Sequence, residues 1–182
     1  MSGDVSDASA STCRAATLDD VDAIVMLVES AYRGESSRAG WTTEADLLDG
    51  QRTDHAAVRE AVDRPGSVVL LTPRVGPPLG CCHLEQRADR ICYFGMFAVS
   101  PTEQSAGVGR RLLVEAERFA RVQWDANVME MTVITQRRDL IAWYERRGYS
   151  STGEIRPFPH GDERFGLPRR DDLAFEVLAK RL

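Results

Sequence analysis

Residues 104–109 read QSAGVG, and Arg110 and Arg111 follow them directly. An apolar run, residues 91–99, precedes this stretch, and apolar residues at helical spacing come after it. The two glycines therefore lie between a predicted strand and a predicted helix, whose first backbone N–H groups have no intrahelical partner. Because those groups and the helix dipole attract negative charge, the stretch predicts a loop that binds an anion such as a pyrophosphate. A tight turn without any ligand explains two glycines equally well.

Two better-known phosphate motifs do not fit this loop. A P-loop ends in Gly-Lys-Ser/Thr, whereas Gly109 is followed by two arginines. The dinucleotide fingerprint requires a third glycine in the pattern G-x-G-x-x-G, and the residue at that position is Leu112. The loop is therefore expected to bind a different ligand.

Length and composition are those of an ordinary globular protein. The chain has 182 residues, of which 43% are apolar and 28% charged, which suits one domain with a sizeable core. Residues 1–12 are rich in Ser, Ala and Asp and predict a disordered leader, so the domain is expected over residues 13–182. This leader has neither the basic start nor the apolar segment of a secretory signal, which predicts a cytoplasmic protein.

Charge, hydropathy and cysteine spacing argue against several kinds of partner. The formal net charge of −5 disfavours charge-driven binding to nucleic acid. No apolar run approaches the roughly 20 residues that cross a bilayer, so no membrane association is expected. The four cysteines form no C-x-x-C motif and the three histidines are far apart, which predicts neither a disulfide framework nor a metal site. Cys81 and Cys82 are adjacent, so on a strand their side chains would point to opposite faces.

The periodicity of apolar residues gives the order of the elements. Helical spacing, with Thr17 as a capping residue, predicts helices over residues 18–32, 42–49, 56–63, 107–121 and 139–147. Apolar segments between turn signals predict strands over residues 67–72, 79–86, 91–99, 128–135, 149–155 and 173–178. Three consecutive strands between helical regions predict an α+β (mixed α/β) fold with mostly antiparallel pairing.

A second motif, residues 140–149, reads LIAWYERRGY. An apolar strand ending in Val-x-Pro, then Q-x-x-G-x-G at a helix start, then A-x-Y-E-x-x-G-Y about thirty residues later, resembles the GNAT superfamily of N-acetyltransferases. The first two parts match at Val99, Pro101, Gln104, Gly107 and Gly109, and the third at Ala142, Tyr144, Glu145, Gly148 and Tyr149. The predicted elements follow the order of that family from about residue 14 to the end.

The resemblance implies a fold and a cofactor. The fold would be a central twisted, mostly antiparallel sheet of about six to seven strands flanked by helices. Acetyl-CoA, without a metal, would bind between two splayed strands, residues 91–99 and 128–135, where the backbone of one strand pairs with the pantetheine amides. The cofactor-binding residues that the resemblance implies are Phe97, Ala98, Val99, Gln104, Ser105, Ala106, Gly107, Val108, Gly109 and Arg110. A homodimer is expected only by analogy with this family.

The resemblance also implies a mechanism. An unprotonated amine of a small molecule or a peptide would attack the thioester directly, without a covalent enzyme intermediate. Tyr144 matches the proton donor to the leaving thiolate, and a phenol with an ordinary pKa near 10 is protonated at neutral pH. The alternative role for Tyr144 is packing on the buried side of the last helix. Tyr149 follows the helix-ending Gly148 and is expected to be structural.

The general base is left open. Glu35, Glu85, Glu103 and His83 are candidates, each of which also fits a solvated or structural role, and a chain of waters is a further alternative. A nucleophilic cysteine is a rival mechanism, for which Cys92 on the central strand is best placed. Since no His or Asp stands in a recognisable partner context, Cys92 is expected to be a core residue.

One position departs from the family pattern. Many members carry Asn seven residues before the tyrosine, whereas this chain has Arg137 there, followed by Arg138. Either Arg137 replaces a polar contact near the pantetheine arm, or both arginines are solvated. The solvated arrangement is the expectation from sequence.

Two loops outside the motifs are candidates for binding the acceptor. They cover residues 32–41 and 156–172, and both combine Arg, Glu and aromatic side chains. The candidate substrate residues of the first loop are Arg33, Glu35, Arg38 and Trp41. If these loops bind the acceptor, the arginines suggest that it carries a carboxylate or phosphate beside its amine. Exposed connecting loops can have the same composition.

The leading hypothesis from sequence is an acetyl-CoA-dependent N-acetyltransferase that acts on an amine of a small molecule or a protein. A non-catalytic acyl-CoA-binding sensor or interaction module is the alternative from another functional class. Transfer of a longer acyl chain, or transfer to oxygen, is a third hypothesis.

Overall fold

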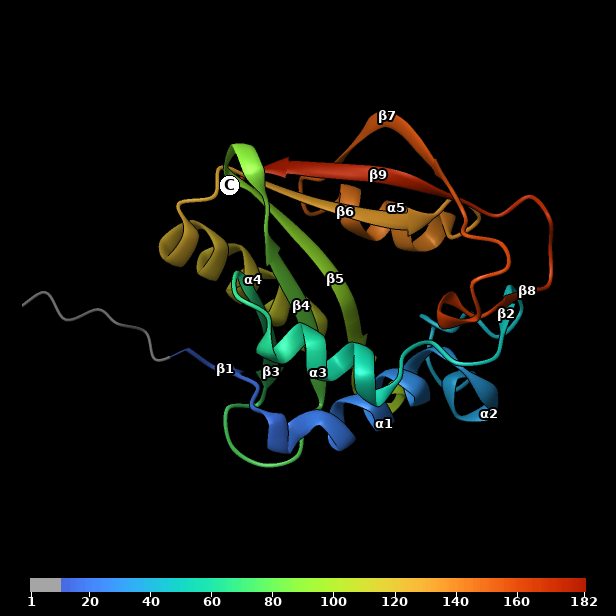
Figure 1. The fold of residues 1–182 in the computed structure, drawn as a ribbon, viewed down its shortest axis with the longest axis horizontal. Coiled ribbons are helices and arrows are strands. Elements are labelled where there is room, and N and C mark those ends of the chain that lie inside the picture. Colours follow the sequence, from blue (N-terminus) through green and yellow to red (C-terminus); the bar gives the residue numbers. More distant parts are fainter. Residues whose placement is uncertain (1–10) are drawn as a thin grey trace, which may run out of the picture.

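A seven-stranded sheet forms the centre of the computed structural model, which describes residues 11–182 (Figure 1). Its strand order is β1-β3-β4-β5-β6-β9-β7. All neighbouring strands are antiparallel except β5 and β6, which run parallel. The predicted mixed fold with a mostly antiparallel sheet is therefore confirmed. The strands are β1 (Arg14–Ala15), β3 (Ser67–Thr72), β4 (Gly80–Gln86), β5 (Ile91–Val99), β6 (Val128–Ile134), β7 (Ser150–Pro157) and β9 (Ala174–Arg181).

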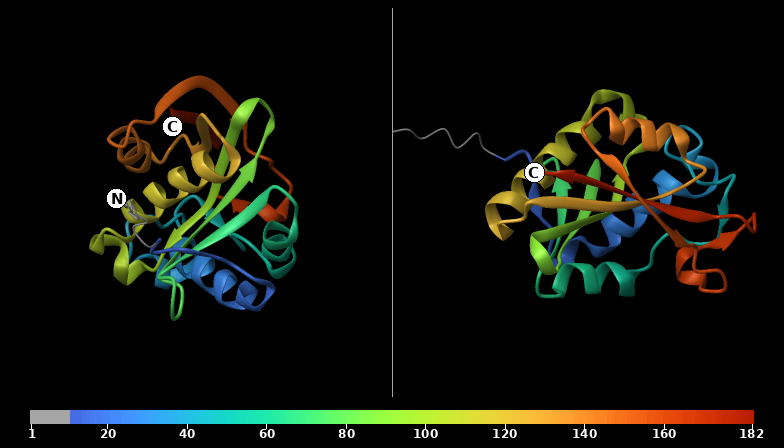
Figure 2. Two further views of the ribbon diagram at one scale, coloured as in Figure 1. Left: turned by 90° about the vertical axis from the view of Figure 1, so that its left-hand side faces the viewer. Right: turned by 90° about the horizontal axis from the view of Figure 1, so that it is seen from above.

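Helices cover both faces of this sheet (Figure 2). α1 (Val21–Tyr32) and α3 (His55–Asp63) pack on one face, and α4 (Val108–Trp124) and α5 (Arg138–Glu145) pack on the other. The single-turn α2 (Gly34–Ser37) follows α1. Short 3-10 turns occupy Leu18–Asp20, Ala88–Arg90, Pro101–Ala106 and Glu163–Phe165. No helix within residues 11–182 is long and apolar enough to cross a membrane.

Alternation of side chains along β4 connects the sheet to both layers of helices. Cys81 belongs to the core that includes Ile24 and Val28 of α1, whereas Cys82 belongs to the core that includes Leu112 of α4. The prediction that the two cysteines point to opposite faces is confirmed. Because successive residues of β4 are buried on opposite sides, this strand fixes the sheet between the two helical layers.

The parallel pair of β5 and β6 is short. The two strands pair at three positions, Ile91 with Val128, Cys92 with Met129 and Tyr93 with Glu130. Further along, β5 remains paired with β4 and β6 with β9, so β5 and β6 diverge (Figure 1). The splayed strands that the family resemblance implies are thus present in the structure.

A β-bulge in β5 lies where the divergence begins. His83 pairs with Gly95 and Cys81 pairs with Ala98, so one residue of β4 faces two residues of β5. Met96 in the bulge has a φ of +43°. A bulge adds a residue to one strand and bends it, and bulges are frequent beside active sites. The bulge therefore lies in the part of β5 that is not paired with β6.

Residues 42–49 do not form the predicted helix. They form turns and end in β2 (Leu48–Asp49), which pairs with β8 (Leu167–Pro168). The N–H of Glu44 donates to the carbonyl of Tyr32 at 3.1 Å, and its carboxylate accepts from Arg33 at 2.7 Å. These contacts with distant residues outweigh the local helical spacing. The two-residue strands β1, β2 and β8 correspond to no pattern in the sequence.

The predicted disordered leader lies mostly outside the described residues, which begin at Ser11. The hydroxyl of Ser11 donates to Oε2 of Glu115, on α4, at 2.6 Å. Ser11, near the end of the predicted leader, therefore contacts α4.

Candidate active site

The glycine loop turns the chain from β5 into α4. Gly107 is the residue before α4 and has a φ of +73°, a conformation that costs glycine little and other residues more. Gly109 is required for a different reason. A Cβ at Gly109 would lie 3.2 Å from Cζ of Phe97 and 3.4 Å from Cγ2 of Val99. One glycine thus allows the turn, and the other allows the first turn of α4 to approach β5 closely.

A cleft of about 220 Å³ opens beside this loop. It is lined by Trp41, Thr42, Phe97, Val99, Gln104, Ser105, Gly107, Gly109, Arg110, Leu140, Trp143 and Arg147. Seven of the ten residues that the resemblance implied for the cofactor are in this set. The other three have different surroundings, because Ala98 and Val108 are buried in the core and the carbonyl of Ala106 accepts from Arg111 at 3.1 Å.

Arg147 adds a second cation to the cleft beside Arg110. Its guanidinium carbon lies 3.5 Å from the ring centroid of Trp143, and its Nη1 donates to the Trp143 carbonyl at 2.6 Å. Burial, together with the nearby Arg146 and Arg110, lowers the pKa of Arg147 below its ordinary value. The sequence prediction missed Arg147, although it lies within the second motif. Arg110 and Arg147 thus line the cleft together with the glycines that precede and begin α4, an arrangement that suits a phosphate.

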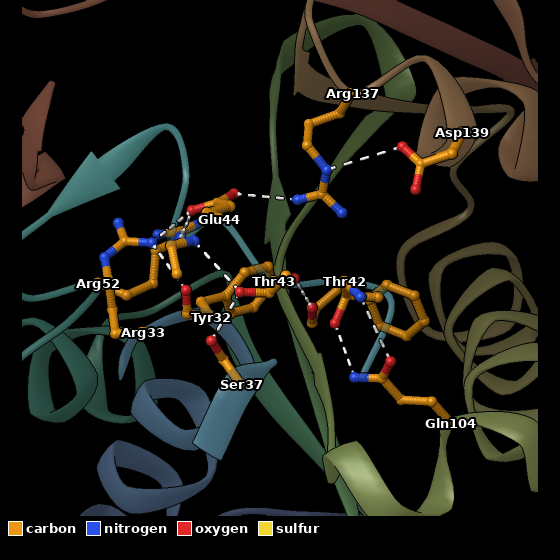
Figure 3. A network of polar contacts seen from close by, with 12 residues as sticks. Tyr32, Arg33, Ser37, Thr42, Thr43, Glu44, Arg52, Gln104, Arg137 and Asp139 are labelled. Atoms are coloured by element: carbon orange, nitrogen blue, oxygen red, sulfur yellow. Dashed lines mark hydrogen bonds and ion pairs between the residues drawn. The ribbon is translucent and has the colours of Figure 1, made fainter. Parts of the chain in front are cut away.

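Gln104 lines the cleft, and its side-chain amide connects two segments of the chain through hydrogen bonds (Figure 3). Its Oε1 accepts from the backbone N–H of Trp41 at 2.8 Å and of Thr42 at 3.4 Å. Its Nε2 donates to Oγ1 of Thr42 at 2.7 Å and to the carbonyl of Val99 at 3.1 Å. A Cβ at Gly40 would lie 2.6 Å from Oε1 of Gln104, so the chain passes close to this amide. Gln104 is therefore a positioning residue that holds Trp41 at the cleft.

A second cavity, of about 230 Å³, adjoins the cleft. The two spaces share the lining residues Phe97 and Leu140. We call the space beside the glycine loop the cofactor cleft and the second space the inner cavity. The inner cavity passes through the gap between β5 and β6. It is lined by Tyr32, Glu44, Leu48, Arg52, His83, Tyr93, Phe94, Gly95, Met96, Phe97, Met131, Thr132, Val133, Ile134, Arg137, Leu140, Tyr144, Phe158, Phe165 and Phe175.

Tyr144 lies on α5 beside the junction of the cleft and the inner cavity. Its ring centroid is 6.4 Å from that of Phe97 and 5.7 Å from that of Tyr149, which it meets edge to face. Burial raises the pKa of Tyr144 well above its usual value. The phenol is therefore protonated near neutral pH, so it can act as a proton donor.

Tyr149 has the structural role that the sequence predicts. It is buried, and its hydroxyl donates to Oε1 of Glu117 at 3.0 Å. Lys180 binds the same carboxylate at 2.8 Å. Cys92 is also a core residue, and burial raises its pKa to about 12, so its thiol is not ionised at neutral pH. The rival mechanism with a nucleophilic cysteine has no support in this arrangement.

Of the four candidate bases, only His83 lines the inner cavity. Glu35 has 92% of its side chain exposed, and Glu85 is paired with Arg64 at 2.9 Å. Glu103 lies in the turn before the glycine loop and is absent from the lining of both the cleft and the cavity. His83 is therefore the one of these four candidate bases that lies at the same cavity as Tyr144.

Hydrogen bonding decides which nitrogen of His83 carries the proton. The hydroxyl of Ser67 donates to the carbonyl of Ala61 at 2.6 Å. This hydroxyl has a single proton, so at its 2.7 Å contact with Nε2 of His83 it must accept. The neutral ring thus carries its proton on Nε2, and Nδ1 has a free lone pair. Burial lowers the pKa of His83, and Arg64 and Arg87 add to this effect against the opposing influence of Glu85.

A group of buried charges borders the inner cavity (Figure 3). Oε2 of Glu44 accepts from Nη1 of Arg33 at 2.7 Å and lies 3.7 Å from Nε of Arg52. Oε1 of Glu44 lies 3.7 Å from Nη1 of Arg137. The expectation that Arg137 is solvated is wrong, because Arg137 is buried; the neighbouring Arg138 is exposed. Folding of residues 42–49 around Glu44 draws Arg137 inward.

The candidate substrate residues of the first loop, residues 32–41, lie in three different surroundings. Trp41 lines the cofactor cleft, with its ring 6.3 Å from that of Trp143. Arg33 is buried against Glu44. Arg38 pairs with Asp46 at 2.9 Å, and Arg38 and Glu35 line a separate hollow that does not include Tyr144. From the second loop, Phe158 and Phe165 reach the inner cavity.

Comparison with known families identifies the family of this chain. The sequence model of the acetyltransferase (GNAT) family matches residues 25–149, more than half of the chain. The chain belongs to the acetyltransferase (GNAT) family. It is accordingly an N-acetyltransferase that uses acetyl-CoA, as the two motifs imply. No curated protein sequence matches it. Within residues 11–182, no group of three or more His, Cys, Asp or Glu side chains is arranged to hold a metal ion.

Solved acetyltransferase structures share the fold. A Bacillus anthracis protein assigned as a streptothricin acetyltransferase, in complex with acetyl coenzyme A, has a TM-score of 0.55 and 15% identity, over 68% of this chain and 67% of its own. The Escherichia coli ribosomal-protein-S18-alanine N-acetyltransferase has a TM-score of 0.64 and 14% identity, over 93% and 92%. A spermidine N-acetyltransferase chimera from Vibrio cholerae and hSSAT has a TM-score of 0.65 and 14% identity, over 93% and 95%. Identities this low show a common fold alone.

The role of Gln104 gives a first prediction. Gln104→Ala removes the hydrogen bonds that hold Trp41 and Thr42 at the cleft, so acetyl-CoA should bind roughly tenfold more weakly, the equivalent of one or two lost hydrogen bonds. Isothermal titration calorimetry measures this change. Glu103→Gln, an adjacent carboxylate-to-amide change outside the network, is the control and should bind as the wild type does. Equal affinity of Gln104→Ala and wild type would show that the Gln104 amide has no part in shaping the cleft.

Proposed function

We propose that this protein transfers the acetyl group of acetyl-CoA directly to an amine of a small molecule or a protein, with the two substrates meeting in the gap between β5 and β6. The observation that carries this proposal is the buried Tyr144, which lines one of two adjoining spaces and lies close to the other. The cofactor cleft opens beside the glycine loop, and the inner cavity adjoins it at Phe97 and Leu140. An enzyme that brings two substrates together needs such a pair of spaces with a proton donor between them.

The cofactor cleft supports a particular orientation of acetyl-CoA. The pyrophosphate would lie at the start of α4, against the N–H groups near Gly109 and the side chains of Arg110 and Arg147. The pantetheine arm would follow the free edge of β5. On that edge, the hydroxyl of Tyr32 donates to the carbonyl of Phe97, and Gln104 donates to the carbonyl of Val99. Each carbonyl has a second lone pair, so both can still accept from a pantetheine amide.

The proposed reaction uses two residues for its protons. The neutral amine attacks the thioester carbonyl carbon, a C–N bond forms and the C–S bond breaks. Tyr144 donates its phenolic proton to the departing sulfur, which would otherwise leave as a thiolate. Nδ1 of His83 accepts the proton that the amine loses. Both residues line the inner cavity, and the lowered pKa of His83 keeps it neutral near pH 7.

The proposed acceptor is an amine in view of the fold neighbours. One of them is an N-acetyltransferase of spermidine and another of an alanine of a ribosomal protein, so this fold serves amines of small molecules and of proteins. The inner cavity of about 230 Å³ suits a small acceptor or a single residue at the end of a peptide.

Tyr144→Phe tests the proton donor. The substitution removes one hydroxyl and keeps the packed ring, so kcat should fall about 10²-fold or more, in the range of general acid catalysis, while the KM for acetyl-CoA changes little. Release of free thiol with an accepted amine measures both constants. Tyr149→Phe is the matched control, because it removes a buried hydroxyl one ring away, and its kcat should stay within a few-fold of the wild type. An unchanged kcat in Tyr144→Phe would exclude Tyr144 from the chemistry.

His83→Gln tests the base through the pH profile. In the wild type, kcat should be high above the lowered pKa of His83 and should fall as pH drops through it, because a protonated ring cannot accept a proton. In His83→Gln this acidic limb should disappear, and kcat near pH 7 should be lower by about 10² or more. Glu85→Gln, on the same strand, is the control and should keep the limb, displaced to lower pH because the Glu85 carboxylate raises the pKa of His83. A His83→Gln profile that keeps the wild-type limb would assign the base to another group.

A further inference from the structure

Arg137 is a buried guanidinium that the fold does not satisfy. Its side chain is 6% exposed, and both Nη1 and Nη2 are buried without a hydrogen-bond partner. The carboxylates beside it are Glu44, 3.7 Å from Nη1, and Asp139, 3.9 Å from Nε (Figure 3). Both distances are longer than hydrogen bonds. Leaving such donors unpaired in the interior destabilises a protein, so a group of this kind points to a ligand.

Glu44 only partly offsets the charge of Arg137, because its single negative charge is shared with two other arginines. Its Oε2 accepts from Arg33 at 2.7 Å and lies 3.7 Å from Arg52. One buried carboxylate therefore faces three arginines. Asp139, the other carboxylate near Arg137, is 61% exposed and its charge is screened by solvent. The surroundings of Arg137 thus carry an excess of positive charge, which favours an anion.

The unpaired guanidinium borders the inner cavity in which Tyr144 also lies. The same cavity has aromatic walls, to which Phe158, Phe165 and Phe175 contribute. Arg52 lines it as a second cation and is half-buried against the ring of Tyr32, 5.3 Å from its centroid. An anionic group and an apolar body can therefore be held together in the same cavity that Tyr144 lines.

We propose that the inner cavity binds an acceptor that carries a carboxylate beside its amine, and that Arg137 binds this carboxylate through Nη1 and Nη2. The planar fork of arginine matches the two oxygens of a carboxylate. The aromatic walls select an apolar or aromatic body, so the acceptor class is that of apolar amino acids and their close analogues. This inference rests on the proposed function, because it names the acceptor of the same site.

Matched acceptors test the inference on the wild-type enzyme. L-phenylalanine, L-phenylalaninamide and phenethylamine share an aromatic body and an amine, and only the first carries a carboxylate. Thiol release with acetyl-CoA gives kcat/KM for each, expressed per unprotonated amine because the three amines differ in basicity. The carboxylate should raise kcat/KM roughly 10- to 100-fold, as expected for hydrogen bonds to a charged group. Equal values for the three acceptors would overturn the inference.

Variants assign the effect to Arg137. Arg137→Gln should abolish the preference for the carboxylate, and Arg137→Lys, which keeps the charge and loses the fork, should keep part of it. Arg138→Gln changes the adjacent arginine, which is 78% exposed, and should keep all of it. An Arg137→Gln enzyme that is folded and still prefers the carboxylate would overturn the inference.

A binding measurement separates this inference from the proposed function. N-acetyl-L-phenylalanine and N-acetyl-L-phenylalaninamide are titrated into wild type, Arg137→Gln and Arg137→Lys by calorimetry, without acetyl-CoA. Tighter binding of the charged ligand that depends on Arg137 supports the inference even if no amine is turned over. Turnover of amines with no dependence on the carboxylate overturns the inference and leaves the proposed function intact. Failure of acetyl-CoA to bind, with no turnover of any amine, overturns the proposed function instead.

Discussion

The early separation of β5 from β6 is the constraint on which the rest of the site depends. Three residue pairs join the two strands, and a bulge at Met96 lies in the part of β5 beyond them. A continuous sheet would bury these strand edges against each other and leave no path between its two helical layers. The separation instead leaves the edge of β5 beside a cleft on one side and a cavity on the other, which meet at Phe97 and Leu140.

A single segment serves both spaces. Residues 41–52 carry Trp41 to the cofactor cleft, and Glu44 and Arg52 to the inner cavity. Gln104 anchors the start of this segment to the end of β5, and the ion pair of Glu44 with Arg33 anchors its middle. The shape of the acceptor side is therefore linked to the glycine loop through hydrogen bonds, although the two lie far apart in the sequence.

Sequence reasoning predicted the features that local patterns determine. The strands 67–72 and 91–99 agree with the structure, since apolar periodicity between turn signals reflects burial in a sheet. The glycine loop and the role of Tyr149 also follow from local geometry. The placement of Tyr144 beside the cleft agrees with the motif, and its catalytic role stays a prediction.

The residues around the inner cavity could not be predicted from local sequence patterns. Residues 42–49 have helical spacing, yet ion pairing at Glu44 and pairing of β2 with β8 hold them in turns. Arg137 was expected in solvent because nothing in its neighbourhood along the chain shows that Glu44 will face it. Arg52 and Phe175 reach the cavity from segments with no motif. Such contacts depend on tertiary packing, and charge or composition of a loop does not reveal them.

The most direct test of the account is a crystal structure of the complex with acetyl-CoA. The pantetheine arm is expected between β5 and β6, the pyrophosphate at the start of α4 beside Gly107 and Gly109, and the thioester sulfur within hydrogen-bond distance of Oη of Tyr144. A complex with acetyl-CoA outside the gap between the strands, or with its sulfur beyond reach of Tyr144, would contradict it.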